Sequence, residues 1–287
     1  MAANATEPPT DLDERRRAAN ATLALATIPQ VSPCTVEDRE VGPVTVRITT
    51  PAAPVGTLVF LHGGGWFQGD LDSAEAELGP MASLVPCRVV SVGYRLAPEH
   101  PFPTPLDDCL AAYRWAIAEF GGPVALAGTS AGANLAAALC LRLRDEGEPQ
   151  PLVQLLDAPC LDLTLGSPSM EEHGHGGGLT KAAIEEYVRF YVGADHTPEH
   201  PRVSPLFEPD LAGLAPAVIN VCELDAVRDD GERYQAALHE ADVPAACFRV
   251  GAQFHGGWII PMTATHRLML DLRSAALRRA FDGTLVP

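Results

Sequence analysis

A serine lies at the centre of a turn of small residues, Gly128-Thr129-Ser130-Ala131-Gly132. The turn follows the apolar run "VALAG" and leads into "ANLAAALCLRLRD", which has the pattern of a helix. A G-x-S-x-G turn between a strand and a helix presents its serine at the helix N-terminus, where the helix dipole favours a developing negative charge. A plain glycine-rich connection is the alternative, because the bare pattern matches many turns. The flanking strand and helix favour a nucleophile at Ser130.

Three consecutive glycines, Gly63–Gly65, follow another apolar run at 56–62. Such a run costs backbone entropy, so we expect it where backbone N–H groups must face a ligand without obstruction. The oxyanion of a tetrahedral intermediate needs such donors, and the residue after the nucleophile, Ala131, supplies a further one. A phosphate-binding loop is the alternative, but the Lys and Ser/Thr of a Walker motif do not follow. His62 is expected to brace this loop rather than to take a proton.

An acid and a base come just after two further apolar runs. Asp225 follows the run at 216–223 and His255 follows the run at 244–250. In a parallel sheet the carboxyl ends of the strands gather the groups that face a ligand. The chain order Ser, Asp, His is that of α/β-hydrolases. We therefore expect Asp225 to orient His255, and His255 to act as the general base for the serine.

Other acids and histidines compete for these roles. Asp229 and Asp230 are interpreted as residues of a helix N-terminus, which favours acidic side chains. His173 and His175 lie in the glycine-rich stretch "EEHGHGGG" and could bind a metal, but two histidines in such a stretch are more often solvated. We expect them to be solvated, and we predict no metal and no cofactor.

The pattern of apolar residues along the chain predicts the fold that positions these residues. Short apolar or alternating runs predict eight strands, at 35–41, 44–50, 56–62, 87–94, 123–128, 152–158, 216–223 and 244–250. Helical patterns lie between or after them, at 72–85, 104–120, 131–146, 229–242 and 262–280. Strands alternating with helices indicate an α/β fold with a mostly parallel sheet covered on both faces, and the two alternating runs indicate an antiparallel edge.

Two segments do not follow this alternation. Residues 163–205 contain no strand pattern but do contain the helical sequence "TKAAIEEYVRFYVG", and residues 1–34 contain an amphipathic helix with "DERRR" on its wet face. The apolar positions of that helix are Leu12, Ala19, Leu23 and Ala26. We name residues 1–34 and 163–205 the cap segments, and expect one domain, 1–287, in which they cover the site.

The composition excludes several classes of protein. The formal charge of −17 disfavours binding to nucleic acid or to an anionic membrane. No run of about 18 apolar residues could span a bilayer. Seven cysteines without C-x-x-C pairs suit free thiols in a reducing compartment, so we predict a cytoplasmic protein. Lys181 is the only lysine, which leaves codon bias and adaptation to salt as open explanations.

The chain resembles the hormone-sensitive-lipase family of carboxylesterases. The resemblance rests on "HGGGW", on "GTSAG", on "GYRLAPEHPFP" at 93–103 and on the passage around the acid at 204–245, and it covers about residues 40–280. It implies an α/β-hydrolase fold and the following roles: Ser130 nucleophile, Asp225 acid, His255 base, and Gly64, Gly65 and Ala131 oxyanion donors. For the 93–103 segment we expect a structural role, with Arg95 and Glu99 paired.

The sequence departs from the family's usual pattern at Thr129, Ala226 and Gly256-Gly257-Trp258, the last of which alters the pocket wall. The resemblance implies a small-molecule ester substrate with a short to medium acyl chain, and a possible homodimer formed through an edge strand. Removal of an acetyl group from an amine or alcohol of a specialised metabolite is the alternative on the same triad. A lyase of the family carries Thr at the nucleophile, which Ser130 disfavours. A non-catalytic binding protein would usually lack one member of the triad.

Overall fold

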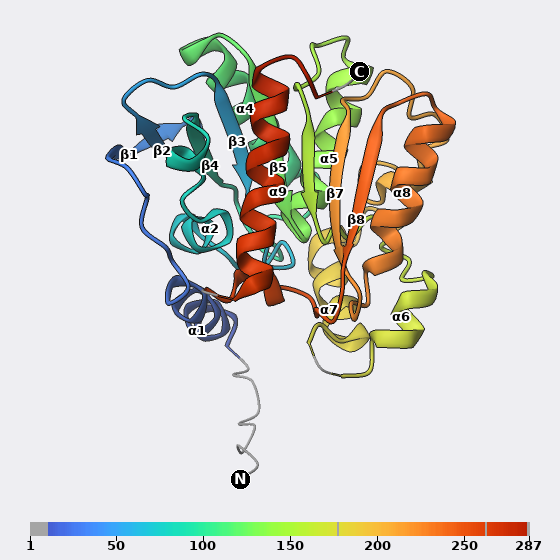
Figure 1. Cartoon of the computed structure of the whole chain (residues 1–287). Helices are drawn as coiled ribbons and strands as arrows, with labels where there is room; N and C mark the ends of the chain where they lie inside the picture. Colours follow the sequence, from blue (N-terminus) through green and yellow to red (C-terminus); the bar gives the residue numbers. More distant parts are fainter. Residues whose placement is uncertain (1–10, 177, 262, 286–287) are drawn as a thin grey trace.

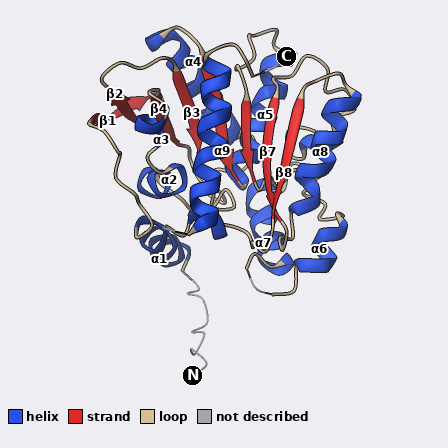
Figure 2. Ribbon diagram, viewed as in Figure 1, coloured by secondary structure: helices blue, strands red, loops and turns tan. Residues whose placement is uncertain are grey.

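A computed structural model of the chain describes residues 11–176, 178–261 and 263–285, so the first ten residues of the cap segments lie outside the described residues. A single sheet has the strand order β1-β2-β4-β3-β5-β6-β7-β8, with helices on both faces (Figures 1 and 2). The strands are β1 (Cys34–Val41), β2 (Val44–Pro51), β3 (Thr57–Leu61), β4 (Arg88–Gly93), β5 (Val124–Thr129), β6 (Gln154–Asp157), β7 (Ala217–Cys222) and β8 (Ala245–Val250). β1 and β2 are antiparallel and β3 to β8 are parallel, as predicted.

The helices follow the predicted alternation, with one correction. They are α1 (Leu12–Ala24), α2 (Leu71–Leu78), α3 (Met81–Leu84), α4 (Thr104–Phe120), α5 (Ala131–Asp145), α6 (Pro168–His173), α7 (Lys181–Val192), α8 (Arg228–Glu240) and α9 (Ala264–Phe281). The single helix predicted at 72–85 is wrong: Gly79 takes a φ of 64° and Pro80 follows it, which ends α2 before α3 begins. The described residues of the 163–205 segment, which leave out residue 177, contain no strand, as predicted.

The continuous apolar runs are explained by two cores, one on each face of the sheet. Along β3, Val59 and Leu61 belong to the core that contains residues of α4, α5 and α8, whereas Leu58 and Phe60 belong to the core that contains residues of α3 and α9. Alternate side chains of a strand point to opposite faces, so a strand covered on both faces is apolar throughout. This burial fixes the strands whose carboxyl ends carry the predicted site residues.

The helices of the cap segments, α1, α6 and α7, all lie at the lower end of the molecule in Figure 1, with α1 on the left and α6 on the right, near the carboxyl ends of the parallel strands. Three of the predicted apolar positions, Leu12, Ala19 and Leu23, lie in α1 and are half-buried; the fourth, Ala26, is also half-buried but lies in the turn after the helix. The expectation that "DERRR" faces solvent is partly wrong, because Arg15 and Arg16 are also half-buried. Arg15 forms an ion pair with Glu186, and Arg16 forms one with Glu99.

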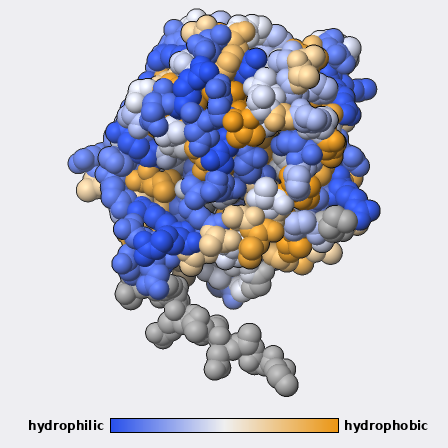
Figure 3. Space-filling model, turned by 90° about the vertical axis from the view of Figure 1, so that its left-hand side faces the viewer, coloured by the Kyte–Doolittle hydropathy of each residue, from blue (hydrophilic) through white to orange (hydrophobic). Residues whose placement is uncertain are grey.

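The side face nearest β1 and β2 is largely hydrophilic, with apolar residues gathered toward its lower end (Figure 3). Among the described residues, no helix combines the length and the apolar composition needed to cross a bilayer.

Candidate active site

Ser130 lies in a sharp turn between β5 and α5. Its backbone has a φ of 54° and a ψ of −115°, a conformation that is rare for a residue with a side chain. The flanking glycines explain how the turn closes: a β-carbon on Gly132 would lie 2.0 Å from the Leu61 carbonyl oxygen, and one on Gly128 would lie 2.3 Å from the Gly132 oxygen. The Ser130 N–H donates to the Asp157 carbonyl at 2.8 Å, which holds the turn against β6.

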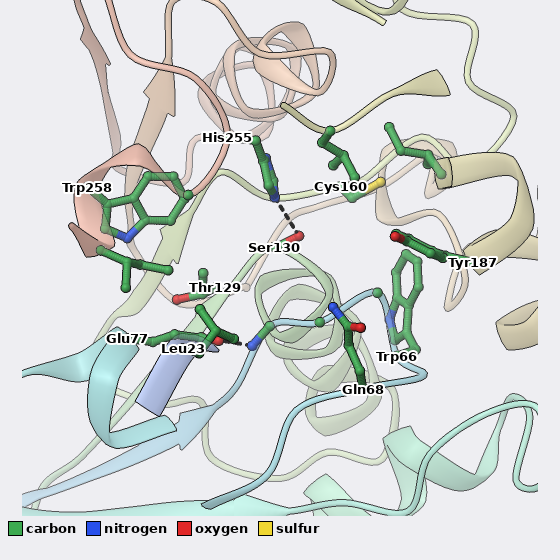
Figure 4. Close-up of a pocket in the computed structure, with 17 residues that line it drawn as sticks. Leu23, Trp66, Gln68, Glu77, Thr129, Ser130, Cys160, Tyr187, His255 and Trp258 are labelled. Atoms are coloured by element: carbon green, nitrogen blue, oxygen red, sulfur yellow. Dashed lines mark hydrogen bonds between the residues drawn. The ribbon is translucent and has the colours of Figure 1, made fainter. Parts of the chain in front are cut away.

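The three residues predicted to act together are brought together. His255 Nε2 lies 2.9 Å from Ser130 Oγ, and His255 Nδ1 lies 2.7 Å from Asp225 Oδ2 (Figure 4 shows the first contact). Asp225 is 1% exposed, and its other oxygen accepts the Val227 N–H at 3.1 Å. The three side chains come from the ends of β5, β7 and β8, so the sheet itself sets their spacing.

The electrostatic environment of His255 combines opposing effects. Burial lowers its pKa, whereas the charge and hydrogen bond of Asp225, together with the charge of Glu77, raise it; the net result is a pKa above the ordinary 6.5. A raised pKa means that the imidazolium is stabilised, which is the form that a general base reaches in the transition state.

The two rival aspartates are occupied elsewhere. Asp230 is buried and accepts the Leu161 and Asp162 N–H groups and the Ser167 hydroxyl, and burial raises its pKa to about 7. Asp229 accepts the Ser169 N–H and pairs with Arg228. Both lie in the first turn of α8, as predicted, where Asp230 attaches the start of this helix to the loop that follows β6 and Asp229 attaches it to α6.

The glycine run borders the same cavity as the serine. Gly64 and Gly65 take φ values of 106° and 60°, and both line the cavity with Ser130. A β-carbon on Gly64 would lie 2.3 Å from the Gln68 carbonyl oxygen, and one on Gly65 would lie 2.6 Å from the Tyr187 ring. Ala131 is the first residue of α5. Glycine is therefore required here both by backbone conformation and by space.

His62 and His175 lie as expected, the second exposed to solvent, whereas the solvation expected of His173 is wrong, because its side chain is only 16% exposed. His62 is buried, stacks on Tyr94 at 4.2 Å and contacts the Gly63 oxygen through Nδ1 at 2.8 Å; burial lowers its pKa to about 4. It braces the glycine run as a neutral ring. His173 Nε2 contacts Arg228 at 2.9 Å. No group of three potential metal ligands exists in the part of the chain that the structure describes.

The pairing predicted for the 93–103 segment is wrong. Arg95 pairs with Asp108 of α4 at 2.8 Å, and Glu99 pairs with Arg16 of α1 at 2.6 Å. Each partner is distant in sequence, so local spacing could not identify it. The segment is structural, but it attaches to two different helices.

The cavity at Ser130 measures about 200 Å³ and has walls of different character. Figure 4 shows Cys160, Tyr187 and Trp66 on one side of Ser130, and Thr129, Leu23 and Glu77 on the other. Three aromatic residues, Trp66, Tyr187 and Trp258, border the cavity. Phe67 packs behind Tyr187 at 4.6 Å and Tyr191 stacks on Trp66 at 4.5 Å, and both support the wall from outside.

A buried acidic residue of the site, Glu77, could not be identified from the sequence. Glu77, in the last turn of α2, is 4% exposed, lines the cavity, and accepts the Gly63 N–H through Oε2 at 2.8 Å. Its only signal in the sequence is an acid at a helical position where the apolar face continues on both sides, at Ala76 and Leu78. That signal does not say which distant backbone group the acid meets.

The fold and this site together define an α/β-hydrolase, and comparisons with known proteins agree. A family model described as the alpha/beta hydrolase fold matches residues 58–259. The chain is 41% identical over 229 residues to the carboxylic ester hydrolase LipN of Mycobacterium tuberculosis, covering 75% of this chain and 61% of LipN. It is 36% identical over 250 residues to the carboxylesterase NlhH of the same species, covering 81% of this chain and 78% of NlhH.

Solved structures of esterases are also similar to this chain. An esterase from Pyrobaculum calidifontis superimposes with a TM-score of 0.89 at 30% identity, covering 98% of this chain and 96% of that one. An esterase from the bacterial hormone-sensitive lipase family gives a TM-score of 0.89 at 28% identity, covering 96% and 94%. The chain belongs to the hormone-sensitive-lipase family within the α/β-hydrolase fold.

Proposed function

We propose that this protein is a serine carboxylesterase that hydrolyses short- to medium-chain acyl esters through an acyl-enzyme intermediate. The observation that carries the proposal is the continuous hydrogen-bonded chain Ser130–His255–Asp225 at the edge of a largely apolar cavity. Relatives named as esterases and carboxylesterases support the same activity.

The proposed reaction begins when Ser130 Oγ attacks the ester carbonyl and its proton passes to His255 Nε2. Asp225 accepts a hydrogen bond from the Nδ1–H of His255 and so holds the imidazole in the tautomer whose Nε2 is free to take that proton. The backbone N–H groups of Gly64, Gly65 and Ala131 stabilise the oxyanion. Collapse of the intermediate breaks the bond to the alcohol, which leaves with the proton from His255. Water activated by His255 then attacks the acyl-enzyme and releases the acid and free Ser130.

The size and lining of the cavity support small acyl esters. At about 200 Å³ it is smaller than a typical drug-sized pocket, and Leu179, Ile184 and Tyr187 give it an apolar wall. The test is a series of p-nitrophenyl esters from acetate to long-chain acyl groups, assayed beside a panel of N- and O-acetylated metabolites. We expect the highest kcat/KM at short to medium chains, and no turnover above background for Ser130→Ala. Faster turnover of an acetylated metabolite than of any simple ester would favour the deacetylase alternative.

The cap segments are proposed to cover the site, and the contacts of α1 support this. Arg16 donates through Nε to the Phe67 carbonyl at 2.6 Å and through Nη2 to the Ala97 carbonyl at 2.8 Å. Asn20 accepts the Gly69 N–H at 3.0 Å, so α1 is attached directly to the loop that continues from the glycine run. Leu23 of α1 borders the cavity. This polar attachment is named the α1 latch (Arg16 and Asn20).

Two finer proposals concern assembly and location. A homodimer through β8 is supported by the free edge of that strand, which pairs with β7 only, and by Phe248, which is 42% exposed beside a hollow lined by Val218 and Leu272. Analytical ultracentrifugation of wild type and Phe248→Arg tests it: dimer for the first, monomer for the second. A cytoplasmic location is supported by seven free cysteines, most of them buried.

A further inference from the structure

Glu77 brings a buried carboxyl group to the start of the glycine run. Besides the 2.8 Å bond from the Gly63 N–H to Oε2, a β-carbon on Gly63 would lie 3.3 Å from Oε1 and 3.2 Å from the Thr129 carbonyl oxygen. The Gly63 backbone is therefore held between the carboxyl group of α2 and the end of β5. Figure 4 shows this carboxyl group beside Thr129, on the wall of the cavity that contains Ser130.

We propose that Glu77 is a positioning residue of the oxyanion site: by accepting the Gly63 N–H, it fixes the direction of the next two peptide groups. The inference rests on the proposed ester hydrolysis, in which the N–H groups of Gly64 and Gly65 stabilise the oxyanion. Glycines at φ values of 106° and 60° have many conformations open to them, so the loop needs an external constraint. A donor aimed at the oxyanion is effective only when it is held in place before the reaction.

The groups around Glu77 act in opposite directions on the pKa of its carboxyl group. Arg273 of α9 donates through Nη1 to the Glu77 carbonyl at 2.7 Å and through Nε to Asp157 of β6, also at 2.7 Å. Burial raises the pKa of Glu77 to about 7, against the opposing effects of the Gly63 N–H and Arg273, while the charge of Asp157 raises it further. The other titratable neighbours are His255 and Tyr94, whose pKa values are both raised in part by the Glu77 charge.

The carboxyl group thus has two separable effects. As an acceptor it orients Gly63, and an amide oxygen could replace it. As a charge it raises the pKa of His255, and no neutral side chain could replace that. Glu77→Gln keeps the acceptor and removes the charge, whereas Glu77→Leu removes both and leaves a buried N–H without a partner. Glu75, half-buried on the same helix with Oε1 3.4 Å from Thr49 Oγ1, is the matched control.

The experiment measures kcat, KM and the pH profile for a short-chain p-nitrophenyl ester with Glu77→Gln, Glu77→Leu and Glu75→Gln. We expect Glu77→Leu to lower kcat roughly 10²-fold, at the lower end of the effect of removing one oxyanion donor. KM should change by less than about threefold. Glu77→Gln should restore kcat to within about fivefold of wild type and move the acid limb of the profile to lower pH. Glu75→Gln should match wild type in both respects.

A kcat for folded Glu77→Leu within about threefold of wild type would overturn the inference, as would a Glu77→Gln protein as slow as Glu77→Leu. If Glu77→Leu does not unfold cooperatively, Glu77→Gln decides: a roughly 10²-fold loss, or an unmoved acid limb, overturns the inference. Ser130→Ala is assayed in parallel. If it retains wild-type hydrolysis, the proposed function itself has failed; if it is inactive, failure of the Glu77 variants concerns only the positioning role.

Discussion

Asp225→Asn removes the anion beside His255 while leaving the shape of the site nearly unchanged. The 2.7 Å contact to Nδ1 would persist, but the amide can present its NH₂ group to that nitrogen and so place the ring proton on Nε2. A ring protonated at Nε2 donates to Ser130 and cannot take its proton. We expect kcat to fall by about 10⁴-fold, equivalent to ~5 kcal/mol of transition-state stabilisation.

The matched control is Asp229→Asn, four residues further along the same segment. Asp229 bonds to the Ser169 N–H and to Arg228, not to His255, so kcat should stay within about threefold of wild type. Both variants are assayed with one p-nitrophenyl ester, after thermal unfolding confirms a cooperative transition. A folded Asp225→Asn protein within about tenfold of wild type, or an Asp229→Asn protein that loses 10³-fold, would refute this choice of acid.

Two further predictions concern the base and the cap. His255 must be neutral to act as a base, and although burial lowers its pKa, Asp225 and Glu77 raise it above 6.5. The value of kcat/KM should therefore rise with pH through a midpoint above 6.5, and a profile that is flat from pH 5 to 8 would contradict a histidine base. Arg16→Ala should loosen the α1 latch, raising KM for longer acyl esters several-fold and changing chain-length preference, with phosphonate labelling within about threefold of wild type. Arg17→Ala, at an exposed position of the same helix, is the control, and an unchanged preference in Arg16→Ala would count against α1 as a cap.

Much of this structure could be predicted because its determinants are local in sequence. The runs that became β3 and β5 are almost entirely apolar, as expected of strands that are buried on both faces. The turn around Ser130 and the glycines before Trp66 are constrained by backbone geometry that few other residues allow. Asp225 and His255 follow from the same rule, since the ends of parallel strands meet at one edge of the sheet.

What could not be predicted depends on contacts between distant segments. The charged neighbours of Arg16 in the sequence predict an exposed position on a helix. In the structure its side chain donates to the backbone carbonyls of Phe67 and Ala97, which lie more than fifty residues away. Arg95 and Glu99 have complementary charges at helical spacing, yet each meets a partner on another element. Glu77 is an acid on a buried helix face, and only the folded structure shows that it meets Gly63.

The central claim is that Ser130 is an activated nucleophile. The most direct test is to treat the folded protein with a fluorophosphonate, digest it, and locate the modified residue by mass spectrometry, with Ser130→Ala and Asp225→Asn in parallel. The mechanism predicts one adduct per chain on Ser130, none in Ser130→Ala, and labelling of Asp225→Asn slowed by several orders of magnitude. No adduct in wild type, or an adduct on another serine that persists in Ser130→Ala, would contradict it.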